Sequence, residues 1–380
     1  MDKQLQQAIA QNYANRRAIV ENCMPMFQPL QTQQISGTVS SSNNVLTFSP
    51  RLTGLLVGFL IEVNATVNNA GAATANRTNF GAANILSRIQ FTDLQNQTRV
   101  NTNGPHLAML NSVKNTRGYG GAVAPNLPFN VGNVWTVNSL ASTIAQNATP
   151  ALRMFYYVPV AYSSQDLTGA IYAQVINATM QLQLTVNVAP GVTTGDPIWA
   201  IYSGATATSS ITLTNVSVTV TQVYYNQPTA LPMVDISRSY LIQDTIANAA
   251  IVANQDISIP YSNFRTYFST FAVYDNAGVF NTGSDVNYWA LQYANLLRQW
   301  QMNPETCALQ TRNAVGYDMP PGLYYFDHRS FPISTANYGN CELVLNAAAA
   351  TSGAFVGAWY EMVAQENTII TASSLPSTGG

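Results

Sequence analysis

The sequence predicts an all-β protein made of two β-sandwiches behind an N-terminal helix. Over most of the chain apolar residues alternate with polar ones, β-branched and aromatic residues fill the runs, and Gly, Pro and Asn separate them. Both halves share this pattern, and each carries one short helical insert after its early strands. Halves with eight or so short strands each are typical of jelly rolls, so we expect a duplicated jelly-roll architecture.

The first 24 residues or so predict a helix. Their apolar residues recur every three or four positions between Gln, Asn and Arg, and Pro25 and Pro29 end the pattern. The segment is too polar to span a bilayer and its apolar stripe is narrow. We therefore expect an arm, residues 1–29, that packs on the body or on a neighbouring chain, with contact to a membrane surface as the alternative. Its candidate contact residues are Lys3, Leu5, Ile9, Tyr13, Arg16 and Arg17.

Residues 30–230 form the first predicted sandwich. Alternation is clearest from Ile211 to Tyr225, where Thr and Ser alternate with Val, Ile and Leu between flanking turn residues. A helical insert runs from Gly104 to Val113, with Pro at the first helical position behind a glycine that can cap it. The predicted strands are Leu55–Val67, Ile85–Phe91, Leu152–Val160, Met180–Val188 and Ile211–Tyr225.

Two prolines within residues 226–237 mark the boundary to the second predicted sandwich, residues 231–366. Its helical insert, Asn303 to Arg312, opens with Asn-Pro in the same way as the first. The final residues, 367–380, predict a flexible tail. They contain LPSTGG at 375–380, which lacks the apolar stretch and basic residues that follow a sortase signal. The predicted strands are Asp256–Pro260, Thr266–Tyr274, Val286–Leu297, Gly322–Asp327, Cys341–Asn346 and Ala354–Ala364.

Charge is scarce in this chain. Only 8% of the residues are charged, against about 25% in an ordinary soluble domain. The net charge of −2, with Lys3 and Lys114 as the only lysines, leaves no basic surplus for a sequence-wide nucleic-acid footprint. A surface of amides and hydroxyls suits self-association. The first residues lack a secretory signal pattern, so we expect synthesis and folding in a cytoplasm.

The sequence offers no catalytic or metal-binding constellation. A metal-dependent jelly-roll enzyme needs several histidines, but only His106 and His328 are present, and the three cysteines are widely spaced. We expect His106 to be an ordinary core or polar residue and His328 to join a strand-end ion-pair cluster with Asp327 and Arg329. At 275–278 the residues DNAG favour a tight hairpin over a Ca²⁺ site. These patterns predict no enzyme activity, no cofactor and no metal.

Tyrosine is abundant, with 20 residues in the chain. Exposed rings could stack on sugars, which would indicate a lectin-like module. Tyrosine is also enriched at protein interfaces, and we favour packing between sandwiches and between subunits. The adjacent pairs are Tyr156-Tyr157, Tyr224-Tyr225 and Tyr324-Tyr325.

Several strings, in order between about residues 79 and 340, resemble the major capsid protein of tectiviruses, which are tailless bacteriophages with an internal membrane. No single string is a chemical signature, and their order and spacing carry the resemblance. They are NFGAANI at 79–85, YVPVAYS at 157–163, DLTGA at 166–170, AIYSGA at 200–205, VYDNAG at 273–278, NTGSDVNY at 281–288, ALQTR at 308–312, GLYY at 322–325 and YGN at 338–340.

The resemblance implies a double jelly roll, two eight-stranded sandwiches side by side, in a major capsid protein without an active site. It further implies a homotrimer with a pseudo-hexagonal base, in an icosahedral shell over an internal membrane, with the N-terminal helix and the tail at the inner end. The expected partners are other copies, minor capsid and membrane-associated virion proteins, and lipid by peripheral contact, without sequence-specific nucleic acid. The expected location is the virion capsid, made in the bacterial host cytoplasm. The alternatives are a carbohydrate-binding β-sandwich spike or receptor-binding protein and, more remotely, a metal-assisted jelly-roll enzyme.

Overall fold

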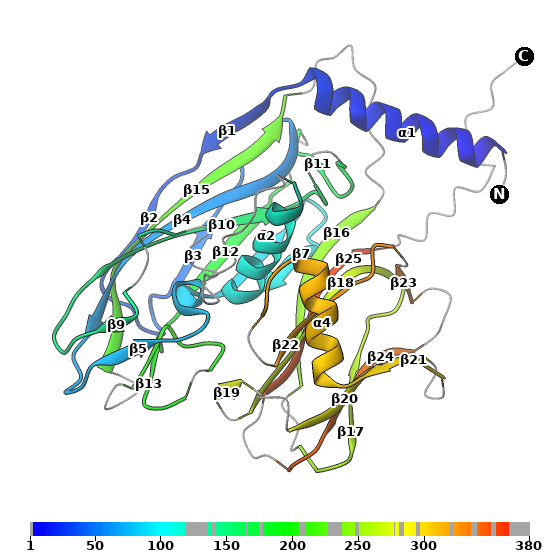
Figure 1. Ribbon diagram of the computed structural model, residues 1–380. Helices are drawn as coiled ribbons and strands as arrows, with labels where there is room; N and C mark the ends of the chain where they lie inside the picture. The colour runs from blue at the N-terminus through cyan, green and yellow to red at the C-terminus, as the bar shows by residue number, and fades with distance from the viewer. Residues whose placement is uncertain are drawn as a thin grey trace, which may run out of the picture.

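The computed structural model arranges the chain as two β-sandwiches side by side, with one helix across one end (Figure 1). This confirms the double jelly roll expected from the sequence. The structure describes residues 3–118, 136–138, 141–163, 166–174, 178–195, 197–204, 210–226, 238–247, 251–276, 278–280, 285–293, 297–319, 322–330, 332–335, 340–350 and 355–364.

The outer sheet of the first sandwich has the strand order β1-β15-β4-β10-β8, with β2 also on β15 and β11 also on β4. A small sheet, β13-β14-β5-β9, lies at the end opposite the long helix (Figure 1). The strands of these two sheets are β1 (Pro25–Pro29), β2 (Gln33–Thr38), β4 (Leu55–Asn69), β5 (Ala75–Arg77), β8 (Thr136–Asn138), β9 (Thr143–Ile144), β10 (Ala151–Pro159), β11 (Ile171–Tyr172), β13 (Gly191–Val192), β14 (Tyr202–Ser203) and β15 (Ile211–Tyr225).

A ten-stranded sheet runs through both sandwiches in the order β19-β18-β25-β16-β7-β6-β12-β3, with β22 and β23 also on β18. Its two parts join where β16 pairs in parallel with β7, Ile242 opposite Val100. Its strands are β3 (Val45–Phe48), β6 (Leu86–Thr92), β7 (Thr98–Thr102), β12 (Gln181–Val186), β16 (Ser239–Ala247), β18 (Arg265–Asn276), β19 (Val279–Phe280), β22 (Leu323–Asp327), β23 (Ile333–Ser334) and β25 (Phe355–Ala364).

The second sandwich is completed by the sheet β17-β24-β20-β21. The expected single strand Val286–Leu297 is wrong: β20 ends at Tyr293, and β21 begins at Leu297 and pairs antiparallel with it. A single apolar pattern thus covers parts of two strands of a hairpin. The strands are β17 (Asp256–Pro260), β20 (Val286–Tyr293), β21 (Leu297–Met302) and β24 (Cys341–Ala347).

In the described part of the chain, three helices and one 3-10 turn accompany the sheets. They are α1 (Lys3–Asn22), η1 (Gly81–Ile85), α2 (Gly104–Gly118) and α4 (Pro304–Val315). Both inserts expected from the sequence are therefore helical. Asn303 caps α4 as expected, because its side chain accepts a hydrogen bond from the Thr306 amide. No described helix combines the length and the apolar character needed to cross a bilayer.

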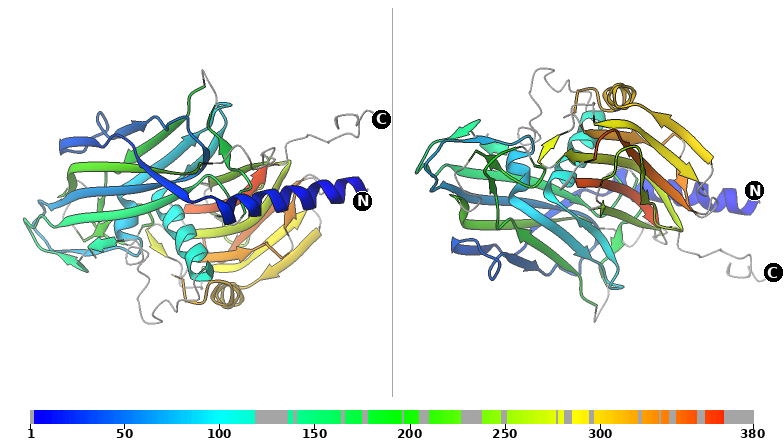
Figure 2. Two further views of the ribbon diagram at one scale, coloured as in Figure 1. Left: turned by 90° about the horizontal axis from the view of Figure 1, so that it is seen from above. Right: turned by 90° about the horizontal axis from the view of Figure 1, so that it is seen from below.

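One hydrophobic cluster crosses from the first sandwich into the second. It contains most of the buried apolar side chains of the first sandwich together with Phe271, Tyr325 and Trp359 of the second, and the rest of the second sandwich has a cluster of its own. Residues 227–237, where the sequence places the boundary, and the tail 367–380 lie outside the described residues. Because core side chains and a sheet both cross the junction, the two sandwiches pack as one body (Figure 2).

Candidate assembly site: the sandwich junction and the docked arm

Helix α2 lies at the junction between the sandwiches. Its first turn is capped by Asn103, whose side-chain oxygen accepts a hydrogen bond from the His106 amide at 2.8 Å, so the cap precedes the Gly104 suggested by the sequence. Gly104 has a different role. A Cβ atom there would lie 2.1 Å from the Ala83 carbonyl oxygen, so only glycine lets the helix approach the chain this closely.

His106 packs across the junction from α2. Its ring stacks on Trp359 of β25 with the centroids 5.3 Å apart and meets Phe271 of β18 edge-on at 5.7 Å. Its Nδ1 lies 2.6 Å from the Thr102 hydroxyl. Complete burial lowers its pKa to about 3, so the ring is neutral at physiological pH. His106 is a core residue, as the sequence indicates.

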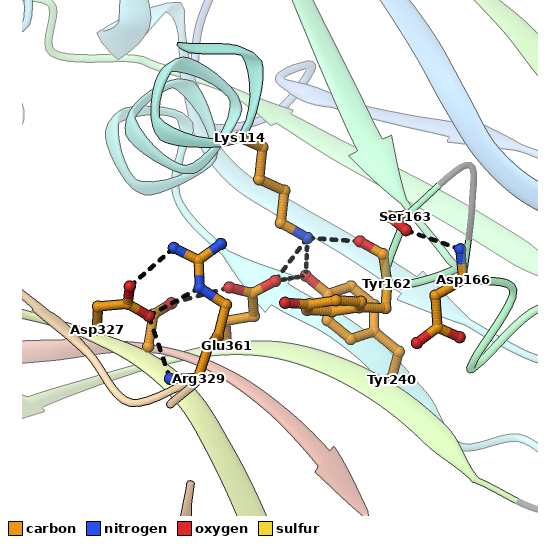
Figure 3. A network of polar contacts seen from close by, with 9 residues as sticks. Lys114, Tyr162, Ser163, Asp166, Tyr240, Asp327, Arg329 and Glu361 are labelled. Atoms are coloured by element: carbon orange, nitrogen blue, oxygen red, sulfur yellow. Dashed lines mark hydrogen bonds and ion pairs between the residues drawn. The ribbon is translucent and has the colours of Figure 1, made fainter. Parts of the chain in front are cut away.

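Lys114 reaches from α2 to the second sandwich (Figure 3). Its Nζ donates to the Tyr162 carbonyl and to the Tyr240 hydroxyl, both at 2.8 Å, and lies 2.5 Å from a Glu361 carboxylate oxygen. Tyr240 and Ser269 also donate to this carboxylate, at 2.7 and 2.9 Å. We call the contacts of Lys114 with Tyr162, Tyr240 and Glu361 the Lys114 clamp.

The clamp joins groups of unlike exposure. The Glu361 side chain is 2% exposed and that of Lys114 22%. Burial first, and then the neighbouring carboxylate, raise the pKa of Tyr240 well above its ordinary value, so its hydroxyl keeps the proton that it donates to Glu361. A buried carboxylate with three donors is well compensated, whereas loss of its cation would be costly.

A second ion pair crosses the junction beside β16. Arg88 of β6 lies 2.9 Å from the Asp244 carboxylate, which also accepts a hydrogen bond from Asn103. Burial raises the pKa of Asp244 despite the opposing effect of Arg88. Both charged contacts therefore link the same two sandwiches, and both partners on the second sandwich are 2% exposed.

The arm docks through the last turns of α1. Ile19 and Cys23 are buried with Leu55 and Val57 in a separate cluster on the outer face of β4. This cover explains why Leu55–Phe59 is buried without interruption while the rest of β4 alternates. Figures 1 and 2 show the arm extending from the first sandwich over the end of the second.

The six candidate arm residues fall into three groups. Arg16 is 12% exposed and forms an ion pair with Asp166 at 2.9 Å, so it belongs to the docked face. Arg17 is 71% exposed and pairs along the helix with Glu21 at 2.6 Å, and Tyr13 is 65% exposed. The side chains of the other three lie outside what the structure describes: Lys3, Leu5 and Ile9.

The remaining sequence candidates are structural. Asp327 and Arg329 form the expected ion pair at 2.7 Å, but His328 does not join it. Its ring is buried, and its Nε2 lies 3.2 Å from the Thr270 hydroxyl of β18. Within the described residues no group of three or more His, Cys, Asp or Glu could hold a metal ion.

Four of the six paired tyrosines pack inward: Tyr156, Tyr225, Tyr324 and Tyr325 are at most 4% exposed. The Tyr156 hydroxyl donates to a backbone carbonyl, and Tyr325 packs on Phe271 with the centroids 4.7 Å apart. These four rings are core residues with no free face for a sugar, while Tyr157 and Tyr224 are half-buried.

Sequence reasoning missed the clamp and the Arg88 pair. Two signals were present: Lys114 is one of two lysines in the chain, and Glu361 is the single charge in the otherwise apolar strand Phe355–Ala364. A lone charge inside a buried strand indicates a partner, but it does not say which residue supplies it.

Comparisons with known proteins agree with this geometry. A family model described as P3 major capsid protein N-terminal matches residues 3–228, and its P3 major capsid protein C-terminal counterpart matches residues 238–377. Major capsid protein P3 of Enterobacteria phage PRD1 is 34% identical over 383 residues, which cover 98% of this chain and 96% of that protein.

Solved capsid structures share the fold. The STIV MCP, from Sulfolobus Turreted Icosahedral Virus, has a TM-score of 0.64 at 11% identity. The match covers 93% of this chain and 99% of the STIV chain. PBCV-1 VP54, fitted into a reconstruction of the virophage Sputnik, has a TM-score of 0.57 at 12% identity, with 90% and 94% covered. At such identities the likeness bears on the fold alone.

Proposed function

Since this chain belongs to the P3 major capsid protein family, we propose that three copies associate into a pseudo-hexagonal capsomer and that such capsomers tile an icosahedral shell over an internal membrane. Family membership makes the chain a structural major capsid protein of a phage virion and not an enzyme. We further propose that it is made and assembled in the cytoplasm of the bacterial host.

The rigid junction is the observation that carries the capsomer proposal. Two sandwiches of similar build are fixed side by side by a shared sheet, a hydrophobic cluster that crosses the junction and two ion pairs whose carboxylates are buried. Three such bodies around a threefold axis present six similar columns, which can occupy a site with six neighbours. A loosely linked pair of sandwiches would not keep this outline.

Light scattering coupled to size exclusion, with negative-stain images of the peak, tests the capsomer. We expect three times the chain mass of 41.1 kDa and a hexagonal outline. A monodisperse monomer would contradict the proposal. A trimer that binds glycans on an array and fails to form particles would favour the carbohydrate-binding spike instead.

The arm is the proposed assembly element. All the described side chains from Gln4 to Gln11 are exposed, so they offer surface to another molecule. An isolated helix of this length is marginal in water, which favours a partner that covers this surface in the particle. The two arginines, Arg16 and Arg17, are paired with Asp166 and Glu21. With both arginines paired to carboxylates, Lys3 is the one other charged residue of this amide-rich helix, which suits a neighbouring copy better than an anionic lipid surface.

Deleting residues 2–14 tests this role while keeping the docked turns around Ile19. We expect trimers to form normally and particle yield to fall, with Arg17→Ala as a control that keeps the arm. Wild-type particle yield from the deleted chain would refute the arm's role.

We also propose that minor capsid proteins, membrane-associated virion proteins and, peripherally, lipid contact the end of the molecule that carries α1. Flotation with anionic vesicles that is lost on deletion would show that the arm binds lipid.

A further inference from the structure

We propose that the docked arm holds the Lys114 clamp closed, so that the position of α1 is transmitted to the junction between the sandwiches. This inference goes beyond the proposed role of the arm in assembly, because it gives arm movement a second consequence within the chain. The path consists of hydrogen bonds and close contacts through Asp166, Thr168 and Tyr162.

Arg16 holds the first part of this path. Its Nη1 lies 2.9 Å from an Asp166 carboxylate oxygen and also donates to the Thr168 hydroxyl. The same carboxylate oxygen accepts from the Thr168 amide at 3.0 Å and from its hydroxyl at 2.7 Å. One guanidinium on the arm thus fixes two residues of the body relative to each other.

Tyr162 connects this group to the clamp. Its amide donates to the Thr168 carbonyl at 2.9 Å, and its own carbonyl accepts from Lys114 at 2.8 Å. The Tyr162 ring also faces the Lys114 ammonium, with Nζ 4.8 Å from the ring centroid. The amide and the carbonyl of Tyr162 belong to neighbouring peptide units. A shift of Thr168 therefore turns the Tyr162 carbonyl that accepts from Lys114.

Gly169 adds a direct contact with the second sandwich. It has φ +88°, and a Cβ there would lie 2.4 Å from the Cβ of Tyr240. The backbone after Thr168 therefore rests against the residue that accepts from Lys114 and donates to Glu361. Movement on the arm side reaches the clamp through Tyr162 and through Tyr240.

The scarcity of lysine provides a direct assay. Lys3 and Lys114 are the only lysines of the chain. Acylation of the full chain followed by mass spectrometry of its peptides therefore measures the labelling rate of Lys114 separately from that of Lys3. We expect Arg16→Ala to raise the Lys114 labelling rate about threefold or more, which is typical of disturbed coupling between sites. Asp166→Asn should act in the same direction.

Arg17→Ala is the matched control, because Arg17 has the same charge one residue away and forms its ion pair with Glu21 of the same helix. Glu361→Gln is the positive control, since it weakens the clamp directly. Unchanged Lys114 labelling in Arg16→Ala, with hydrogen exchange showing the arm released, would overturn the coupling. An equal rise in Arg17→Ala would also overturn it.

The deletion of residues 2–14 separates the two proposals. It keeps Arg16, so labelling of Lys114 should stay near wild type while particle yield falls. Normal particles would refute the assembly role of the arm without touching the coupling. The Arg16→Ala labelling result alone decides the coupling.

Discussion

Replacing Lys114 by Met should destabilise the junction, because it leaves the Glu361 carboxylate buried without a cation. Removing one partner of a buried ion pair costs about 3–5 kcal/mol. Lys114 is 22% exposed and Glu361 keeps two donors, Tyr240 and Ser269, so the lower end of that range applies, about 3 kcal/mol.

The melting temperature, at fixed protein concentration, measures this loss. With an unfolding entropy of about 2.1 cal/mol/K per residue, 3 kcal/mol lowers the midpoint by about 4 °C if all 380 residues unfold together. If the second sandwich, about 130 residues, unfolds as its own unit, the fall is about 11 °C. The size of the shift thus also reports whether the junction holds both sandwiches in one cooperative unit.

The double variant Lys114→Met, Glu361→Gln should recover at least half of the loss, since a neutral amide tolerates burial better than a carboxylate. Arg17→Met removes an exposed pair and should leave the melting temperature near that of wild type. A Lys114→Met midpoint within about 1 °C of wild type would refute the reasoning. So would a double variant no more stable than the single one.

Three further outcomes follow from buried groups. Burial lowers the pKa of His106 and His328 to about 3 from 6.5, so the unfolded chain binds more protons between these values and stability falls as pH drops below about 6.5. Each ring contributes about 1.4 kcal/mol per pH unit over this range. In the double variant His106→Asn, His328→Asn the melting temperature should therefore depend less on pH. Gly104→Ala should cost at least about 3 kcal/mol or abolish folding, read as soluble yield, because its Cβ would lie 2.1 Å from a backbone oxygen. Burial raises the pKa of Cys307 and Cys341 to about 12, so iodoacetamide at pH 7.5 should label them only after denaturation. Rapid labelling of the native protein would contradict their placement.

Local patterns determined most elements of this protein. The alternation from Ile211 to Tyr225 became β15 with the same bounds, and Asn303-Pro304 opened a capped helix. Strand alternation and helix capping depend on residues within a few positions of one another, so they can be read along the chain. The ordered strings likewise pointed to the capsid family that the comparisons show.

Only the tertiary structure decided how the two halves join. The strand β16, with Gln243, Asp244 and Thr245 in its middle, carries no strong strand pattern and was not expected. It is stable because Arg88 neutralises Asp244 and because β7 and β25 pair with its two edges, all from distant parts of the sequence. Lys114 meets Glu361 for the same reason. A buried charge is acceptable only beside its partner, and that partner is set by the packing of the two sandwiches and not by neighbouring residues.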